Sequence, residues 1–141
     1  MNWGFRTILT LAVALSAIPV SRAAVFYVDA VQGDDAYNGS VANFVSGLDG
    51  PKKTIHSAMQ LLSAGDTLSI AKGTYLESIK VNQTQVWETS DTVLIKSLYM
   101  QASGGELVLQ GSMLYVRDSL QMDVGLITVN SGFVFSTKEY A

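Results

Sequence analysis

The sequence predicts an all-β solenoid with one short helix that closes its N-terminal end. Two observations lead to this fold class. The second half of the chain reads as strand after strand, and its strands recur with a period of about 20 to 22 residues. A single segment with helical spacing precedes these strands. We therefore expect each coil to stack on the next, with the helix covering the first.

The first 23 residues have the layout of a secretory signal peptide. Arg6 gives a positively charged start, an apolar run extends from Ile8 to Ile18, and the small residues Ser21 and Ala23 precede the expected cleavage site. This run falls short of the roughly 20 apolar residues that a membrane-spanning helix needs. We expect cleavage after Ala23, a mature chain without a transmembrane segment, and a secreted, periplasmic or cell-surface location.

The mature chain is expected to be one small acidic domain. The whole sequence has a formal net charge of -3 and no cysteine, and loss of Arg6 and Arg22 makes the mature part more acidic. Because nucleic-acid affinity comes largely from Lys and Arg on phosphates, no nucleic-acid partner is expected. Without cysteine, disulfides and Cys–His zinc sites are excluded.

Residues 24–66 are predicted to form a strand, a loop and a capping helix. Val25–Val28 is a β-branched and aromatic run, and a loop rich in Gly, Asn and Asp follows it. Thr54 is the expected N-cap of a helix that reaches Leu62, and Gly65 is expected to end it. A helix of about ten residues is marginal alone, so its apolar stripe needs a surface to cover.

Residues 67–141 are predicted to form about three coils, of which the last is expected to be incomplete. Three pairs of segments align when this half is laid against itself: 93–96 with 114–117, 97–100 with 119–122, and 105–110 with 125–130. This gives three short strands per repeat, with Leu107 and Leu109 lying over Ile127 and Val129 and pointing inward. The alternative is a small β-sandwich with chance internal similarity.

Several segments in the first half, taken in order, resemble a known module. They are Phe26-Tyr27-Val28-Asp29, Gly33-Asp34-Asp35, Asn38-Gly39-Ser40, Pro51, Lys53-Thr54-Ile55 with Ala58, Ala64-Gly65-Asp66-Thr67, and Gly73-Thr74-Tyr75 with Glu77. This order is similar to the N-terminal part of right-handed parallel β-helix proteins of the pectate-lyase-like superfamily, which includes secreted polysaccharide lyases and surface proteins. The resemblance covers about residues 25–81, and Lys52 stands where the family usually has an aromatic residue.

The resemblance implies a right-handed parallel β-helix and, for the lyases, a particular chemistry. Family lyases typically hold Ca²⁺ with carboxylates and use a Lys or Arg base, and these residues project from central coils. No residue of this chain matches those motifs, so no catalytic or cofactor-binding residue is assigned. Ca²⁺ is thus an expectation from the resemblance alone.

Two groups of residues are candidates on chemical grounds. Asp29, Asp34 and Asp35 offer the oxygen ligands that Ca²⁺ takes, although they lack the spacing of a known calcium loop. The alternative is that they form Asx turns within the loop. Lys96 and Arg117 occupy matching repeat positions and would line a groove for acidic sugar, or else lie on a solvated outer face.

Three functions stay open. The chain is a non-catalytic secreted or surface module that binds polysaccharide or cell-surface glycan, or the truncated front end of a polysaccharide lyase or hydrolase, or a reading frame without an independent role. His56, the single histidine, is expected to be an exposed helix residue rather than a catalytic base. An open C-terminal coil would present an unpaired edge, so self-association through that end is also expected.

Overall fold

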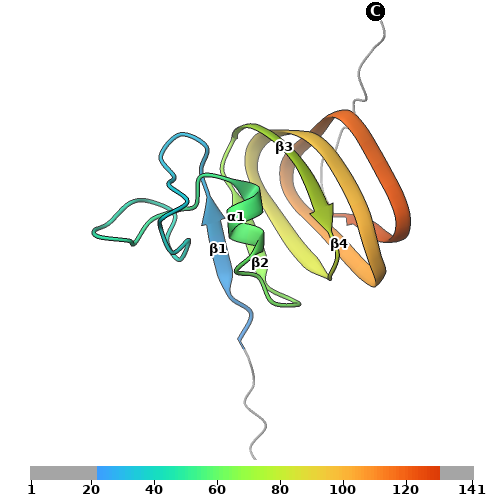
Figure 1. Cartoon of the computed structure of the whole chain (residues 1–141), viewed down its shortest axis with the longest axis horizontal. Coiled ribbons are helices and arrows are strands. Elements are labelled where there is room, and N and C mark those ends of the chain that lie inside the picture. Colours follow the sequence, from blue (N-terminus) through green and yellow to red (C-terminus); the bar gives the residue numbers. More distant parts are fainter. Residues whose placement is uncertain (1–21, 131–141) are drawn as a thin grey trace, which may run out of the picture.

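The computed structural model describes residues 22–130, apart from the side chains at 102–105, 112 and 124. The protein is mostly β-strand with one short helix (Figure 1). Its elements in chain order are β1 (Val25–Val28), α1 (Ile55–Met59), β2 (Thr67–Ile70), β3 (Gly73–Val81) and β4 (Gln85–Val129). The four strands form a single sheet in the order β1-β2-β4-β3, and every pairing is parallel.

Some predictions concern residues outside this range. Residues 1–21 of the predicted signal peptide and residues 131–141 of the predicted last coil lie there, so cleavage and self-association through the C-terminal end stay predictions. Within residues 22–130, no helix is long and apolar enough to cross a membrane.

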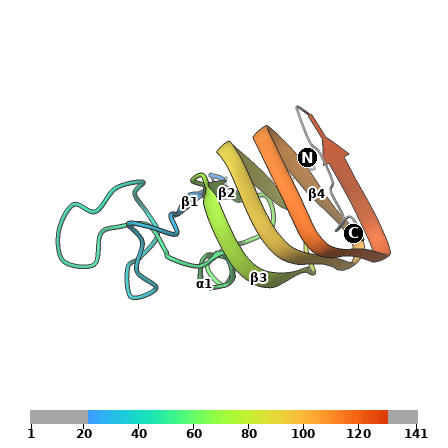
Figure 2. The ribbon, with the colours of Figure 1, turned by 90° about the horizontal axis from the view of Figure 1, so that it is seen from above.

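Sheet partners are separated along the chain by about one predicted repeat. Thr67 pairs with Val86, 19 residues on, and Gly73 pairs with Val93, 20 residues on. At the far end of β4, the Asn130 amide donates to the Leu109 carbonyl at 3.0 Å. Figures 1 and 2 show that β4 bends repeatedly and that its later stretches lie beside its earlier ones.

The three short strands predicted for each repeat are not separate elements. β4 runs for 45 residues without a break, and Gly73 begins β3. Gly111 and Gly125 within β4 have φ values of 99° and 117°. Since glycine adopts positive φ without a Cβ clash, the chain can bend at these points without leaving the strand.

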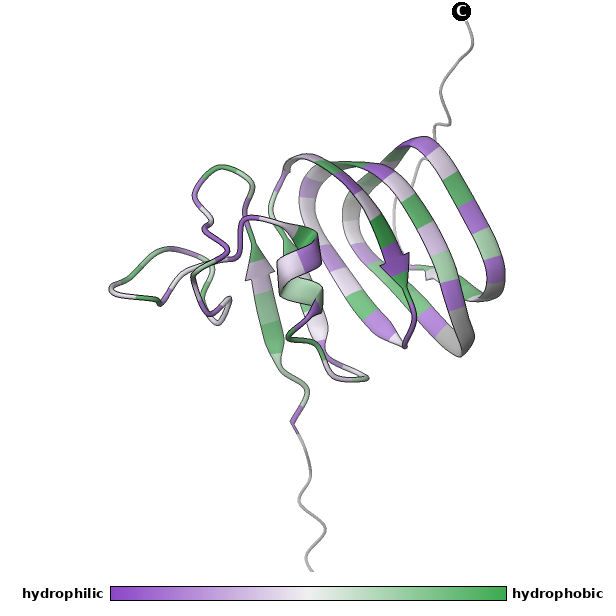
Figure 3. Cartoon of the chain, viewed as in Figure 1, coloured by the Kyte–Doolittle hydropathy of each residue, from purple (hydrophilic) through white to green (hydrophobic). Residues whose placement is uncertain are grey.

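Alternate side chains of the strands point into one apolar core. Leu68 and Ile70 of β2 are fully buried, and Figure 3 shows the alternation of polar and apolar residues along β4. Leu107 and Leu109 are fully buried as predicted, and Ile127 packs against the core. Val129, which was also predicted to point inward, is 43% exposed and is the last residue of β4.

The N-terminal loop protects the outer edge of β1. The Tyr27 amide donates to the Gly39 carbonyl at 2.8 Å, and the Asp29 amide donates to the Lys52 carbonyl at 2.9 Å. The Lys52 amide in turn donates to the Tyr27 carbonyl at 2.9 Å. An unpaired strand edge is a template for aggregation, and here the protein's own loop occupies it.

The helix begins as predicted but is shorter. Thr54 is its N-cap, with Oγ1 accepting from the Ser57 amide at 3.2 Å. The predicted end at Leu62 is wrong, because α1 stops at Met59 with Gln60 as C-cap. The amides of the next two residues donate to carbonyls only three positions back, so the last turn tightens out of α-helical geometry.

α1 packs its apolar side against the strands. Ile55 and Ala58 are fully buried, Leu62 beyond the helix is 8% exposed, and all three belong to the same core as the strands. The helix contacts β1, β2 and β3, and Figure 1 shows it between β1 and β3. The predicted burial of the helix stripe is therefore confirmed.

Candidate functional site

The Asp29 and Asp34 carboxylates stabilise turns of the N-terminal loop. Asp29 Oδ1 accepts from the amides of Val31 and Gln32 at 2.8 and 3.0 Å. Asp34 Oδ1 accepts from the Ala36 amide at 2.9 Å. These are the local side-chain-to-backbone bonds of Asx turns.

Asp35 joins the same loop to the start of α1. Its Oδ1 accepts from the amides of Lys53 and Thr54 at 3.0 and 2.9 Å, and Thr54 Oγ1 donates to Oδ2 at 3.0 Å. Burial alone raises the pKa of Asp35, but the hydrogen bonds from Thr54 and Lys53 outweigh it and lower the pKa below its ordinary value. Asp35 thus acts as an ionised clamp on the backbone before the helix.

These three carboxylates do not fit a Ca²⁺ site. Asp29, Asp34 and Asp35 accept hydrogen bonds from three different segments, whereas Ca²⁺ needs six to eight oxygens converging on one point. Across residues 22–130, no group of three His, Cys, Asp or Glu side chains could hold a metal ion. The arrangement favours the Asx-turn alternative for this loop.

Glu77 on β3 completes the cap of α1. Its Oε1 accepts from the Ile55 amide at 2.9 Å, and its Oε2 accepts from the His56 amide at 2.8 Å. The first amides of a helix have no partner within the helix. This role of Glu77 was not predicted from the sequence, because a residue more than twenty positions away reaches the helix only through the fold.

The Lys96 and Arg117 side chains are both exposed. Arg117 Nε lies 2.8 Å from Asp118 Oδ1, and the hydrogen bond and charge of Asp118 raise the pKa of Arg117. No hydrogen bond or ion pair of the described residues joins Lys96 to Arg117. Their placement agrees with the solvated outer face that was weighed as the alternative.

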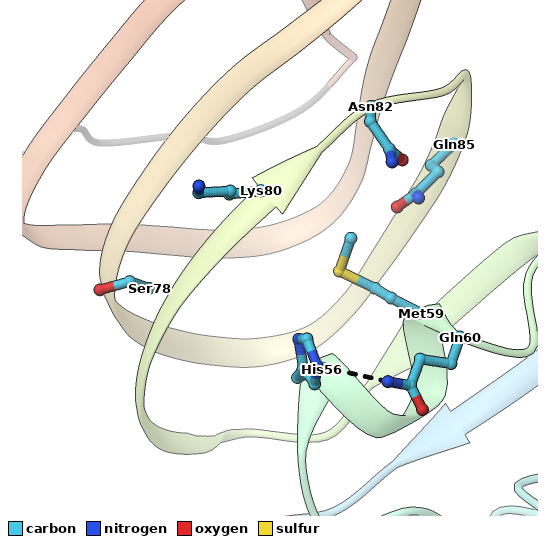
Figure 4. A pocket seen from close by; sticks show the side chains of 7 residues that line it. All are labelled: His56, Met59, Gln60, Ser78, Lys80, Asn82 and Gln85. Atoms are coloured by element: carbon cyan, nitrogen blue, oxygen red, sulfur yellow. Dashed lines mark hydrogen bonds between the residues drawn. The ribbon is translucent and has the colours of Figure 1, made fainter.

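A groove of about 490 Å³ lies between α1 and β3 (Figure 4). The helix contributes two side chains and its C-cap one, β3 contributes two, and the turn into β4 and its first residue contribute the rest; together these are His56, Met59, Gln60, Ser78, Lys80, Asn82 and Gln85. The lining holds three amides, a hydroxyl, an ammonium group and an imidazole, but no carboxylate. Gln60 Nε2 lies 3.4 Å from His56 Nε2.

The strand alternation explains why β3 presents polar groups here. Ser78 and Lys80 are exposed, whereas Ile79 and Val81 between and after them are buried. His56 lies on the exposed side of α1, as expected. The groove therefore forms where the polar sides of a helix and a strand meet.

Gln85 is the buried polar member of this lining. Its side chain is 1% exposed, and its Oε1 accepts from Trp87 Nε1 at 2.9 Å. Gln85 was not among the site residues predicted from the sequence. The signal was present, since period-two alternation places Gln85 on the same side of the strand as Trp87.

A second groove, of about 520 Å³, brings Asp29 close to Asp91 of β4. Lys72 and Ser90 also line it. Two of its side chains are carboxylates, so its charge is mixed, in contrast to the α1–β3 groove.

Comparisons with known proteins return no relative. No protein-family model, no curated protein and no solved structure matches the chain. The resemblance to the pectate-lyase-like superfamily therefore stays an expectation from the sequence.

Proposed function

We propose that the chain is an end module of a right-handed parallel β-helix in an exported protein, and that it binds glycan without converting it. The parallel sheet supports this architecture, because paired strand residues lie about 20 positions apart along the chain. The helix α1 supports it as well, because its apolar side is buried against the strands. The handedness follows the strong right-handed preference of parallel crossovers.

The observation that carries glycan binding is the composition of the α1–β3 groove. Its amide and hydroxyl groups both donate and accept hydrogen bonds, as sugar hydroxyls do. Met59 adds an apolar surface for the carbon face of a ring. The volume, about 490 Å³, lies in the range of small-ligand sites.

The same lining favours binding over hydrolysis. Most glycoside hydrolases use a pair of carboxyl groups flanking the scissile bond, and the α1–β3 groove has none. The three carboxylates once considered for a metal are engaged with the loop backbone. The module therefore holds a ligand rather than transforming it.

Binding and turnover are tested on the same purified mature protein. Calorimetric titration with soluble oligosaccharides should show saturable binding. Ultraviolet absorbance, followed on pectate and alginate with Ca²⁺, should show no unsaturated uronate product. Sustained product formation would instead favour a lyase and direct attention to Lys96 and Arg117.

Export is tested independently. The Arg6, apolar-run and Ala23 arrangement supports cleavage by a signal peptidase. N-terminal sequencing of the stable extracytoplasmic product should begin at Ala24. A stable product that retains Met1 would contradict the proposal.

A further inference from the structure

We propose that Asp66 binds the α-ammonium group that signal-peptide cleavage creates at Ala24. The inference rests on the proposed export, with cleavage after Ala23, and it goes beyond glycan binding. It assigns a role to a carboxylate that lines neither of the two grooves. Asp66 lies directly before β2, and its side chain is only 8% exposed.

The fold places the Ala24 nitrogen against this carboxylate. The nitrogen donates to Asp66 Oδ1 at 2.8 Å, and Asp66 Oδ2 accepts from the Ser63 amide at 2.7 Å. The Ala24 carbonyl is held as well, because it accepts from the Thr67 amide at 2.8 Å. Both backbone groups of Ala24 are therefore fixed at the point where the parallel pairing of β1 and β2 begins (Figure 1).

Two independent observations single out the same nitrogen. The sequence places the expected cleavage between Ala23 and Ala24, whereas the contact with Asp66 is a feature of the fold. Arg22 and Ala23 are exposed, and neither makes a hydrogen bond with another described residue. The described hydrogen bonds of the chain thus begin at the residue that is expected to become the mature N-terminus.

Cleavage changes the charge of this nitrogen. Hydrolysis breaks the peptide bond between Ala23 and Ala24 and consumes one water molecule. The water oxygen joins the Ala23 carbonyl carbon to give a carboxylate, and both water hydrogens end on the Ala24 nitrogen, which becomes an ammonium group. α-Amino groups are mostly protonated at neutral pH. The neutral hydrogen bond from Ala24 to Asp66 thereby becomes a charge-assisted one, which is stronger.

A buried carboxylate is stabilised by this change. No basic side chain of the described residues forms an ion pair with Asp66, and burial of a charge is costly unless the charge is paired and hydrogen-bonded. Water and salt weaken ion pairs at exposed positions, but the Asp66 side chain is largely removed from water. The mature protein is therefore more stable than a form that retains residues before Ala24, so that folding is coupled to export.

The test compares three forms of the purified protein, prepared with defined N-termini. The first has a free amine at Ala24, the second is Nα-acetylated at Ala24, and the third retains Ala23. Acetylation keeps an amide N–H on Ala24 but removes the charge. In urea unfolding followed by circular dichroism, the equilibrium constant for unfolding should be about tenfold higher for the acetylated form than for the free form. The form that retains Ala23 should behave like the acetylated one.

Asp66→Asn identifies the partner of the ammonium group. The asparagine oxygen still accepts a hydrogen bond, but the negative charge is gone, so acetylation should no longer change the stability. Asp34→Asn is the matched control, because Asp34 is exposed and also accepts from a backbone amide. The tenfold effect of acetylation should persist in this control. The three forms with the natural sequence keep the inference falsifiable if Asp66→Asn does not fold.

The outcomes separate this inference from the proposed function. Equal stability of the free and acetylated forms, or an undiminished effect of acetylation in folded Asp66→Asn, would overturn the inference while export stands. N-terminal sequencing of the exported protein tests the step before it. A product that begins at a residue other than Ala24 would overturn both the inference and the proposed cleavage site.

Discussion

The contact of Glu77 with α1 makes a strong prediction about stability. Its two carboxylate oxygens accept from the first two amides of the helix, at 2.9 and 2.8 Å. Hydrogen bonds to charged groups contribute about 1.5–3 kcal/mol each, and the exposed one of the pair contributes less. We expect Glu77→Ala to lower the free energy of unfolding by about 2–3 kcal/mol.

Glu77→Gln separates the two bonds. Its amide retains one accepting oxygen, so one helix amide keeps its partner and the loss should be about 1 kcal/mol. Glu88→Ala is the control, because the Glu88 side chain is exposed on β4 and makes no described hydrogen bond; this substitution should cost less than about 0.5 kcal/mol. Urea unfolding followed by circular dichroism measures all three, and equal losses for Glu77→Ala and Glu88→Ala would refute the capping argument.

Three further variants test other parts of the fold. Leu62→Asp should cost several kcal/mol in urea unfolding by burying a charge, whereas Leu61→Asp, at a 38% exposed position, should cost little. Because the folded-state pKa of Asp35 is lowered from 3.8, the ionised carboxylate stabilises the fold above that pH, and this stabilisation is lost as the pH falls through the folded-state pKa. Asp35→Asn should therefore flatten the acid limb of a curve of unfolding free energy against pH. Gly111→Ala should lower the free energy of unfolding, measured by thermal unfolding, by about 2–4 kcal/mol, because residue 111 has positive φ and the added Cβ would overlap the Thr89 carbonyl. Gly47→Ala, where φ is also positive but the Cβ would meet open space, should cost about 1 kcal/mol.

Local patterns predicted the local structure well. The N-cap at Thr54, the strand Val25–Val28 and the Asx turns of the loop each depend on residues only a few positions apart. The separation of strand partners by about one repeat also agrees with the internal similarity of the sequence. In these cases the local structure is determined by neighbouring residues or by a simple sequence period.

The errors arose where tertiary contacts decide the outcome. The spacing of apolar residues predicted a helix to Leu62, but the Asp66 carboxylate accepts from the Ser63 amide at 2.7 Å and from the Ala24 amide at 2.8 Å, which holds this stretch against β1. Three strands per repeat were predicted from the three pairs of aligned segments, but positive-φ glycines let β4 bend without ending. Local propensity is a weak prior that such contacts override.

The candidate site was missed for a related reason. The charged residues predicted from the sequence include three carboxylates, Asp29, Asp34 and Asp35, that accept hydrogen bonds from backbone amides in the fold. The groove instead takes Gln85 from the inward face of a strand, where it would ordinarily be counted as core. A polar residue on an inward position, next to a buried tryptophan, is the more informative signal, because its burial has to be compensated. Here the amide oxygen accepts from Trp87 Nε1 inside the protein and the residue also lines the groove, which makes the position a candidate for ligand recognition.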